Sequence, residues 1–360
     1  MNDAPSIEIN GRIVGPGHPV YVIAELSANH RQDFEEAVRL VHAAHAAGAD
    51  AVKLQTYTPD TITIDSDAPA FRQGEGSLWE GLTLYQLYGE AYMPWDWQPR
   101  LKELAVSLGM DLFSSPFDAT AVDFLASMDM PAFKIASFEL VDLPLIKRAA
   151  RTGKPMIIST GMGGYDEIEE ALAAAREAGA AGIALLKCTS AYPAPPEEAN
   201  LSRIPHMQAS FGVPVGLSDH TTGIVTPVAA VALGACIIEK HFTLSRSVPS
   251  ADAAFSLEPG EFAAMVAAVR TAEREVGVPT YEPTAKEMQS RRFRRSLFVV
   301  EEVHAGEAFS ERNVRSIRPA GGLHTRHYEE ILGRRAACEI TRGTPLSWEL
   351  VEAGRIEPDA

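Results

Sequence analysis

Residues 132–187 read AFKIASFELVDLPLIKRAARTGKPMIISTGMGGYDEIEEALAAAREAGAAGIALLK. Within this stretch, short runs rich in Ile, Leu and Phe at 132–135, 155–159 and 183–187 are separated by longer segments of helical period. Strands that alternate with helices favour a parallel sheet in which each helix links one strand to the next. The stretch therefore predicts successive βα units.

The same alternation extends from Val20 to Gly277. The candidate strands are 20–25, 51–55, 111–114, 132–135, 155–159, 183–187, 213–218 and 237–241. Helical patterns follow them, for example at 33–47, 119–128, 166–178 and 260–275. Eight βα units in about 260 residues are typical of a (β/α)8 TIM barrel. An open doubly wound sheet is the competing fold, but no G-x-G-x-x-G motif follows the first strand.

Composition limits the classes of partner. The 360 residues carry 32 Lys and Arg against 48 Asp and Glu, a net charge of −16. Nucleic acid and anionic membranes both require a basic surface, which this balance disfavours. No apolar run approaches the roughly 18 residues of a membrane span, residues 1–10 do not resemble a leader, and no C-x-x-C pair is present. We expect a cytoplasmic protein that binds neither nucleic acid nor membrane.

A different composition begins after Gly277, where prolines and a run of arginines precede short strand-like segments. Residues 302–314 and 339–351 both fit the pattern E-[VI]-x-x-G-x-x-[FL]-S-x-x-x-V. This duplication predicts a compact module with a pseudo-twofold axis, too small for chemistry on its own. We therefore expect a barrel domain at 1–278, a linker at 279–290 and a small second domain at 291–360.

A long insertion at 56–94 interrupts the rhythm after the second predicted strand and contains Trp79, Tyr85, Tyr88 and Tyr92. Insertions of this length usually carry function, and we interpret this one as a lid over the substrate. An apolar cluster that merely packs under a long loop is an equally favoured alternative.

Polar and ionisable residues stand at the end of every predicted strand. Catalytic groups of a (β/α)8 barrel collect at these carboxyl ends, and buried charge is costly in a purely structural protein. The barrel is therefore expected to be an enzyme. The residues include Glu25, Lys53, Gln55, Ser115, Lys134, Ser137, Glu139, Ser159, Lys187, Tyr192, Ser218, His220, Glu239 and His241.

Two kinds of site are indicated by these residues. Lys53, Lys134 and Lys187, together with nearby serines, can surround a phosphate or carboxylate; structural ion pairs or a Schiff-base lysine are the alternatives. His220 and His241 end adjacent strands and could bind one divalent ion, Mn or Mg. Glu25, Glu239 or Asp252 could then be further ligands or hydrogen-bond partners of the ligands. Ordinary hydrogen-bonded histidines are the alternative.

Eight motifs in order resemble the sialic acid synthase family. They are AELSANH (24–30), VKLQT (52–56), FSSPF (113–117), FKIASFE (133–139), ISTGM (158–162), KCTSAYP (187–193), GLSDHT (216–221) and IEKHF (238–242). The tail, with SIRP at 316–319 and glycines 321 and 322, is similar to that family's antifreeze-protein-like (SAF) domain. The resemblance implies a TIM barrel followed by a SAF domain.

Within this family the chain most resembles the pseudaminic acid synthase branch. The features are ELSANH (25–30), QTYTPD (55–60), the aromatic segment from LW (78–79) to YMPW (92–95), and AFSL (254–257). One departure is Ser250-Ala251, where the family usually has Gly-Pro before the acidic residue matched to Asp252. That departure puts the local turn and the role of Asp252 in question.

The resemblance implies condensation of phosphoenolpyruvate with an open-chain N-acetylated amino sugar, which yields a nine-carbon 2-keto acid and phosphate. In this branch the sugar is 2,4-diacetamido-2,4,6-trideoxy-L-altrose, and an apolar wall from Trp79, Tyr85 or Tyr92 would suit it. N-acetylneuraminic or legionaminic acid synthesis is the alternative with the same chemistry. A Schiff-base aldolase and a non-catalytic sugar-binding protein are less favoured.

The resemblance also assigns roles residue by residue. Glu25 would be the general acid or base, assisted by Lys53, Lys134, His220 and His241, of which the two histidines would bind Mn or Mg. The residues for phosphoenolpyruvate would be Lys53, Ser115, Lys134, Ser137, Ser159 and Ser218. Those for the sugar would be Gln55, Glu139, Tyr192, Asp252 and Arg318. Because Arg318 lies in the tail, the resemblance further implies a homodimer in which each tail caps the partner's barrel.

Overall fold

The computed structural model describes residues 5–74 and 79–353. The chain divides into two compact units, 1–277 and 278–360. The outermost residues of the two predicted domains and residues 75–78 of the 56–94 insertion, Leu78 among them, lie outside the described residues.

The first unit is a closed barrel of parallel strands, as predicted. Strand β10 pairs with β9 on one side and with β3 on the other, and this pairing closes the ring. The predicted strand ends differ from the observed ones by at most two residues. The strands are β3 (Tyr21–Glu25), β4 (Ala51–Thr56), β5 (Asp111–Pro116), β6 (Phe133–Ile135), β7 (Met156–Ser159), β8 (Ile183–Cys188), β9 (Val215–Asp219) and β10 (Ile237–His241).

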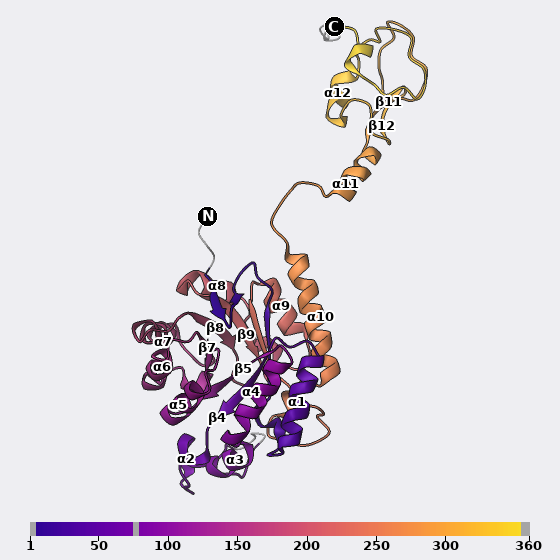
Figure 1. Cartoon of the computed structure of the whole chain (residues 1–360). Helices are drawn as coiled ribbons and strands as arrows, with labels where there is room; N and C mark the ends of the chain where they lie inside the picture. Colours follow the sequence, from indigo (N-terminus) through magenta and orange to yellow (C-terminus); the bar gives the residue numbers. More distant parts are fainter. Residues whose placement is uncertain (1–4, 75–78, 354–360) are drawn as a thin grey trace. The chain divides into compact units, whose positions relative to one another are not determined.

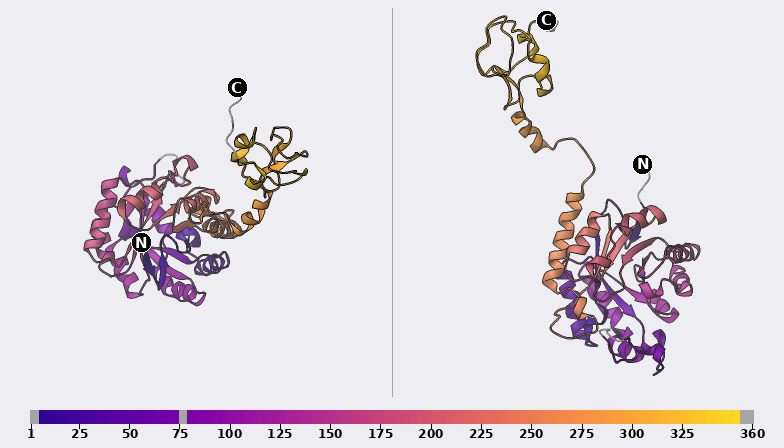
Figure 2. Two further views of the ribbon diagram at one scale, coloured as in Figure 1. Left: turned by 90° about the horizontal axis from the view of Figure 1, so that it is seen from above. Right: turned by 180° about the vertical axis from the view of Figure 1, so that it is seen from behind.

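Helices surround this barrel in a ring, which Figure 2 shows from above. Several begin where an aspartate accepts backbone N–H groups of the first turn, as Asp33, Asp118 and Asp142 do. They are α1 (Phe34–Ala46), α4 (Gln98–Ser107), α5 (Ala119–Ser127), α6 (Leu143–Ala150), α7 (Tyr165–Glu177), α8 (Arg203–Phe211), α9 (Val225–Ala232) and α10 (Pro259–Val276).

Barrel strands are apolar on both faces, and the two faces contribute to different cores. Leu54, Ile135 and Leu185 belong to the large core between strands and helices. Ile23 and Leu186 belong to a smaller core inside the barrel. Neighbouring residues of one strand thus face opposite sides, because side chains alternate along a strand.

An N-terminal hairpin, which the sequence analysis did not predict, closes one end of the barrel. Its strands β1 (Ile7–Ile9) and β2 (Arg12–Val14) are antiparallel and joined by Asn10 and Gly11, both with positive φ. Asn-Gly is the usual dipeptide of such a two-residue turn. Ile7, Ile9 and Val14 are buried in the core inside the barrel.

The 56–94 insertion contains α2 (Pro59–Ile62) and α3 (Leu84–Ala91). These helices lie at the end of the barrel opposite the hairpin (Figure 1). They therefore stand over the carboxyl ends of the strands, as a lid requires. Leu87, on α3, is buried, whereas Tyr85 and Glu90 on the same helix are not.

The second unit has the predicted pseudo-twofold symmetry. It contains α11 (Ala285–Ser290), β11 (Ser296–Val299), β12 (Val314–Ile317) and α12 (Tyr328–Ile331). Val303 and Ile340, which are equivalent in the repeat, pair with each other. The pairs Phe298–Pro345 and Ala308–Arg335 are likewise related by the repeat offset of 37 residues. A duplicated sequence has therefore folded around one shared core.

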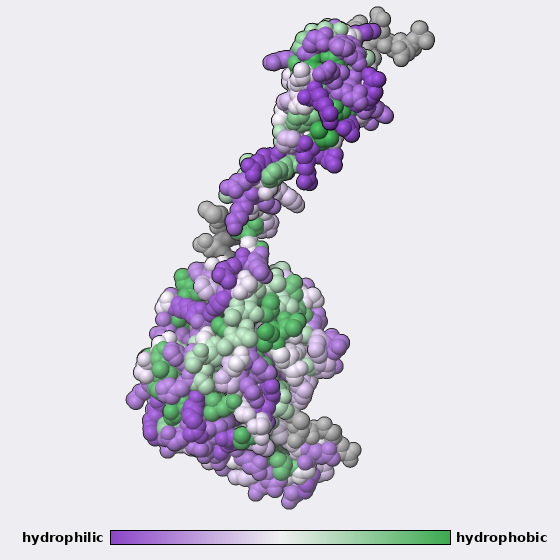
Figure 3. Space-filling model, turned by 90° about the vertical axis from the view of Figure 1, so that its right-hand side faces the viewer, coloured by the Kyte–Doolittle hydropathy of each residue, from purple (hydrophilic) through white to green (hydrophobic). Residues whose placement is uncertain are grey.

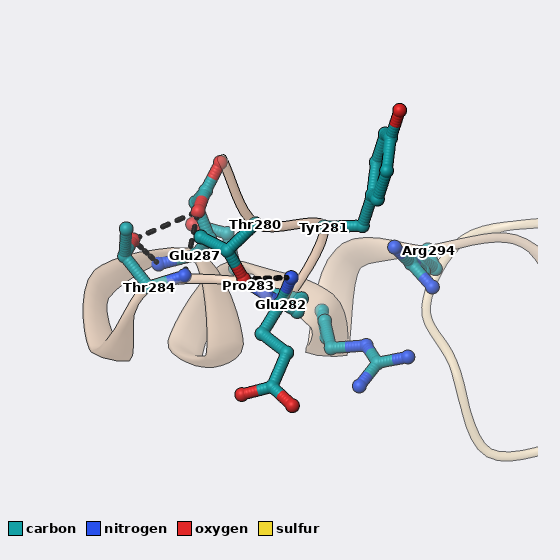
Figure 4. A pocket seen from close by; sticks show the side chains of 9 residues that line it. Thr280, Tyr281, Glu282, Pro283, Thr284, Glu287 and Arg294 are labelled. Atoms are coloured by element: carbon teal, nitrogen blue, oxygen red, sulfur yellow. Dashed lines mark hydrogen bonds between the residues drawn. The ribbon is translucent and has the colours of Figure 1, made fainter. Parts of the chain in front are cut away.

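Helix α11 lies in the predicted linker, beside an open hollow of about 510 Å³ (Figure 4). Thr284 caps the helix, since its backbone N–H donates to Glu287 at 2.7 Å and its hydroxyl accepts from the backbone N–H of Glu287. None of the predicted site residues lines this hollow. Its walls have no feature that connects it to the barrel chemistry.

Hydrophilic and hydrophobic residues are intermixed over the face seen in Figure 3. Within the part of the chain that the structure describes, no helix is both long enough and apolar enough to cross a membrane.

Candidate active site

Side chains alternate between the two faces of a strand, and this alternation decides which strand-end side chains point into the barrel. Lys187 follows the inward-facing Leu186 and precedes the inward-facing Cys188, so its side chain is directed away from the barrel interior. It therefore does not join Lys53 and Lys134, with which it was grouped from the sequence. Asp219 and Lys240 also face outward and form a buried ion pair with each other.

Lys53 is the centre of the inner cluster. Its Nζ lies 2.9 Å from Oε2 of Glu25, 3.3 Å from Oε1 of Glu239 and 3.4 Å from Oγ of Ser115. The strand register explains this contact, because Glu25 is paired with Lys53 on one side and His241 on the other. Glu239, which the sequence suggested as a further metal ligand or as a hydrogen-bond partner of the ligands, accepts hydrogen bonds from Lys53 and from Ser218 at 3.0 Å.

The two carboxylates of this cluster differ in protonation. Burial raises the pKa of Glu25 more than Lys53 lowers it, so the pKa is shifted well above the ordinary value. Burial also raises the pKa of Glu239, but Lys134 and Lys53 together overcome that effect and hold it below the ordinary value. Glu239 therefore stays ionised at neutral pH, whereas Glu25 is the carboxyl that can exchange a proton near neutrality.

Lys134 forms a second centre with the hydroxyls of the next loops. Its Nζ donates to Oγ of Ser159 at 2.6 Å, and the backbone N–H of Gly161 donates to Oγ of Ser137 at 3.1 Å. Burial lowers the pKa of Lys134 to about 8. The ammonium groups of Lys53 and Lys134 exceed the single negative charge of Glu239, and hydrogen-bond donors surround them. The cluster can therefore bind an anion.

His220 and His241 are brought together, with ring centroids 5.3 Å apart. Nδ1 of His220 lies 2.9 Å from the carbonyl oxygen of Thr189, which can only accept, so Nε2 carries the lone pair. Burial lowers the pKa of His241 well below its usual value, and its buried Nδ1 has no hydrogen-bond partner in the described chain. Burial also lowers the pKa of His220, but Cys188 raises it to above the ordinary value.

These two imidazoles fit a divalent ion that takes its remaining ligands from water and substrate. Among the described residues, no group of three or more His, Cys, Asp or Glu side chains is arranged to hold a metal. Glu25 and Glu239 are directed to Lys53, and so they do not complete a ligand set. A closed metal cage made by the protein alone is therefore not formed.

Above the cluster lies a cavity of about 560 Å³. The predicted sugar residues Gln55, Glu139, Tyr192 and Asp252 line it, together with His241. Aromatic side chains form part of the cavity wall: Tyr57, Trp79, Tyr88, Phe117 and Phe138. The predicted apolar wall is thus present, but its composition was only partly right. Trp79 lines the cavity, Tyr85 and Tyr92 do not, and Tyr85 instead donates to Asp60 at 3.1 Å.

The loop that departs from the family pattern still delivers Asp252 to the cavity. The hydroxyl of Ser250 donates to Oδ1 of Asn29, and Nε1 of Trp79 donates to the carbonyl of Ala251 at 3.1 Å. Asp252 in turn accepts from the hydroxyl of Ser27. The turn is therefore held by the first strand-end loop and by the lid.

Two partly buried polar residues complete the lining. Gln55 donates to Oε1 of Glu25 at 2.9 Å and to Oγ of Ser27 at 3.0 Å. Burial raises the pKa of Glu139 to about 7, and its Oε2 has no hydrogen-bond partner among the described residues. Glu139 is thus a second carboxyl that exchanges a proton near neutrality and is available to a ligand.

Some of the site could not be assigned from the sequence. Ser27 and Tyr57 had no predicted role, although each stands two residues after a predicted site residue, Glu25 and Gln55 respectively. Arg318 follows β12 in the second unit, and its contact with the sugar stays a prediction.

A (β/α)8 barrel whose inner rim carries buried lysines, carboxylates and histidines is the architecture of a barrel enzyme. Residues 40–281 match the NeuB family, and residues 294–352 match the SAF domain. The chain belongs to the NeuB family, which confirms the resemblance to sialic acid synthases.

Known relatives extend over nearly the whole chain. It is 44% identical to pseudaminic acid synthase of Helicobacter pylori, over 93% of this chain and 98% of that protein. It is 35% identical to N,N'-diacetyllegionaminic acid synthase of Legionella pneumophila, over 96% and 99% respectively. The crystal structure of N-acetylneuraminic acid synthetase from Leptospira borgpetersenii, in complex with citrate, superposes with a TM-score of 0.71. That protein is 31% identical, and the match covers 80% of this chain and 95% of that chain.

Proposed function

We propose that this protein is a pseudaminic acid synthase. It condenses phosphoenolpyruvate with 2,4-diacetamido-2,4,6-trideoxy-L-altrose and releases phosphate. The observation that carries the proposal is the stacking of two layers in one barrel mouth: a buried anion-binding cluster around Lys53 and Lys134 and, above it, a cavity with aromatic walls. The greater likeness to the Helicobacter synthase than to the Legionella one favours this sugar.

Phosphoenolpyruvate binds in the lower layer. Lys134 and the hydroxyls of Ser137 and Ser159 surround one anionic group, while Lys53, Ser115 and Ser218 surround the other. Negative charge grows on the phosphate as the C–O bond breaks, and preorganised donors in a buried site stabilise that charge. Because these groups are already in place, little reorganisation accompanies the reaction.

The new C–C bond forms between the methylene carbon of phosphoenolpyruvate and the aldehyde carbon of the sugar. Water adds at the carbon that bears the phosphate ester, and phosphate leaves. Glu25 supplies or accepts the proton of the reacting hydroxyl or water, since its raised pKa lets it do either near neutrality. A divalent ion, Mn or Mg, held by His220 and His241, would polarise the sugar aldehyde.

The sugar lies in the upper layer. Gln55, Glu139, Tyr192 and Asp252 offer donors and acceptors to its hydroxyl and acetamido groups. Its 6-deoxy methyl group suits the aromatic walls, because an apolar group gains free energy on leaving water there. Trp79 and Tyr88 belong to the insertion, which makes that segment a lid over the substrate.

The proposal includes a homodimer in the cytoplasm. A tail that caps the partner's barrel would bring Arg318 to the sugar of the other subunit. The three cysteines are free thiols, as is usual for proteins of a reducing compartment.

The deciding experiment measures phosphate release from phosphoenolpyruvate with Mn and a panel of acetamido sugars. We expect turnover with the diacetamido-trideoxyaltrose and at least about tenfold lower kcat/KM with N-acetylmannosamine and the legionaminic precursor. Efficient use of either of those sugars would overturn the assignment. Trapping of substrate by borohydride on a lysine, with full activity in a chelator, would establish the Schiff-base alternative instead.

A further inference from the structure

A second cationic hollow lies beside the barrel mouth, around the loop that follows β8. It has a volume of about 310 Å³. We call it the β8 hollow; it is lined by Met162, Lys187, Cys188, Thr189, Ser190, Ala191, Glu198, Asn200 and Arg203. Neither of its cations has a role in the reaction proposed above.

The two cations of the β8 hollow donate hydrogen bonds to uncharged groups. Lys187 donates to the hydroxyl of Thr189, and Arg203 donates to the carbonyl of Gly163 at 3.4 Å. Within the described chain, neither forms an ion pair, and the carboxylate of Glu198 pairs with no cation although it borders the same hollow. Burial lowers the pKa of Lys187 and the positive charge of Arg203 lowers it further, whereas Cys188 and Asp219 raise it. Two like charges are therefore held close together in a protein whose net charge is −16.

A line of hydroxyl groups connects this hollow to the anion cluster in the barrel. Ser190 lines both the β8 hollow and the sugar cavity. A Cβ atom on Gly161 would lie 2.2 Å from Oγ of Ser190 and 2.7 Å from Oγ of Ser137. Gly161 thus lies between the hydroxyl of Ser137 in the barrel and the hydroxyl of Ser190 at the hollow, and it has no side chain to separate them.

We propose that the β8 hollow is a second phosphate-binding site, which receives the inorganic phosphate released in the barrel. Lysine and arginine together, with a hydroxyl donor such as that of Ser190, are the groups that bind a phosphate dianion in proteins. An oxyanion at this point removes the repulsion between Lys187 and Arg203. The binding of phosphate stands on the hollow alone, whereas the assignment as an exit site rests on the proposed function.

The test is calorimetric titration of the full-length protein with inorganic phosphate in the absence of sugar. We expect two sites in the wild type, one in the barrel and one in the hollow. The double variant Lys187→Gln/Arg203→Gln should lose one of them, and Lys134→Gln should lose the other. Arg176→Gln is the matched control, because Arg176 also donates to a single backbone carbonyl, at 3.2 Å, and lies away from the hollow.

Three results would decide against the proposal. One is a double variant that binds phosphate with the stoichiometry of the wild type. The second is a wild type with a single site that disappears in Lys134→Gln. The third is stronger binding of phosphoenolpyruvate than of phosphate to the hollow in Lys134→Gln, which would make it an entry site for the ester. The single variant Arg203→Lys, which keeps the charge, should retain the site if the double variant fails to fold.

Turnover supplies an independent measurement. The inhibition constant of phosphate as a product should rise about tenfold or more in the double variant, while KM for the sugar stays within about twofold. An unchanged inhibition constant would remove the exit role. Phosphate binding needs no sugar and no turnover, so its failure is distinct from a failure of the synthase assignment.

Discussion

Lys53 and Lys134 are both buried in the barrel, yet their surroundings shift their pKa values in opposite directions. Burial lowers the pKa of Lys53, but Glu239 and Glu25 more than compensate and raise it. Among the described residues, Lys134 donates to Ser159 and to the backbone carbonyl of Ile135 and forms no ion pair, so burial lowers its pKa to about 8. Lys53 is therefore committed to the carboxylates, and Lys134 is the ammonium most available to a substrate anion.

The pKa of Lys134 predicts an alkaline limb in the pH profile of the enzyme. The ammonium is lost as pH rises through about 8, so kcat/KM for phosphoenolpyruvate should fall above that pH. Lys134→Arg, which stays protonated, should move that fall to higher pH, and Lys134→Gln should lower kcat/KM about 100-fold or more at every pH. Steady-state kinetics between pH 6 and about 10 measures both effects.

Lys147→Arg, at a half-buried position of α6, is the matched control and should keep the wild-type profile. An alkaline limb at the same pH in Lys134→Arg would show that another group controls it.

His220 and His241 predict a metal requirement that can be measured without substrate. His220→Ala and His241→Ala should each weaken Mn binding about tenfold or more, because each removes one of two protein ligands. Titration followed by electron paramagnetic resonance reports the free ion. His206→Ala, an exposed histidine at the start of α8, should bind Mn as the wild type does. Wild-type affinity in either buried-histidine variant would argue against the two-histidine site.

Whole elements, rather than single residues, decide which side chains reach the site. Each barrel strand places alternate residues inside and outside, so Glu239 and His241 enter the barrel while Lys240 between them pairs with Asp219 outside. The hairpin β1–β2 closes the other end of the same interior. Its apolar residues keep water from entering the barrel beneath the charged cluster.

The stability of the barrel should therefore depend strongly on the buried face of the hairpin and little on its exposed face. Ile9→Ala removes a fully buried side chain and should lower the free energy of unfolding of the barrel by about 2–5 kcal/mol. Ile13→Ala, in the same hairpin but 45% exposed, should change it by less than about 0.5 kcal/mol. Denaturant unfolding followed by tryptophan fluorescence measures the difference. Equal effects would mean that the hairpin does not seal the barrel.

On the scale of the whole molecule, the second unit raises the question of which barrel it serves. Its core is complete, since Leu297, Val303, Phe309, Ile340 and Leu346 are all buried within it. The pairing of Val303 with Ile340 shows that both copies of the repeat are needed for that core. A module that folds by itself is suited to act on another subunit as easily as on its own.

Subunit mixing tests the proposed exchange of tails. Arg318→Ala leaves the barrel intact and damages the tail, whereas Glu25→Gln damages the barrel and leaves the tail intact. If each tail caps the partner's barrel, co-expression of the two inactive variants should restore about a quarter of the wild-type activity. Activity equal to the sum of the separate variants would show that each tail serves its own barrel. Two differently tagged copies of Arg318→Ala should remain inactive.

The sequence by itself determined the elements and their order. The apolar runs and helical periods are local, so the eight barrel strands and the repeat in the tail were predicted within a residue or two of their observed places. Family motifs then pointed to the lysines, serines and histidines of the site. The Asn10-Gly11 turn is also a local signal, since Asn-Gly is the usual dipeptide of a two-residue hairpin turn.

The face on which a strand-end residue lies was decided only by the tertiary structure. Strands that are buried on both sides read as unbroken apolar runs, so the phase of Lys187 could not be distinguished from that of Lys134. Barrel closure places Lys134 inside with Ser159 and Lys187 outside with Arg203. The pKa of Glu25 likewise depends on Lys53 and Glu239, which come from other strands, because electrostatic surroundings exist only once those strands are packed together.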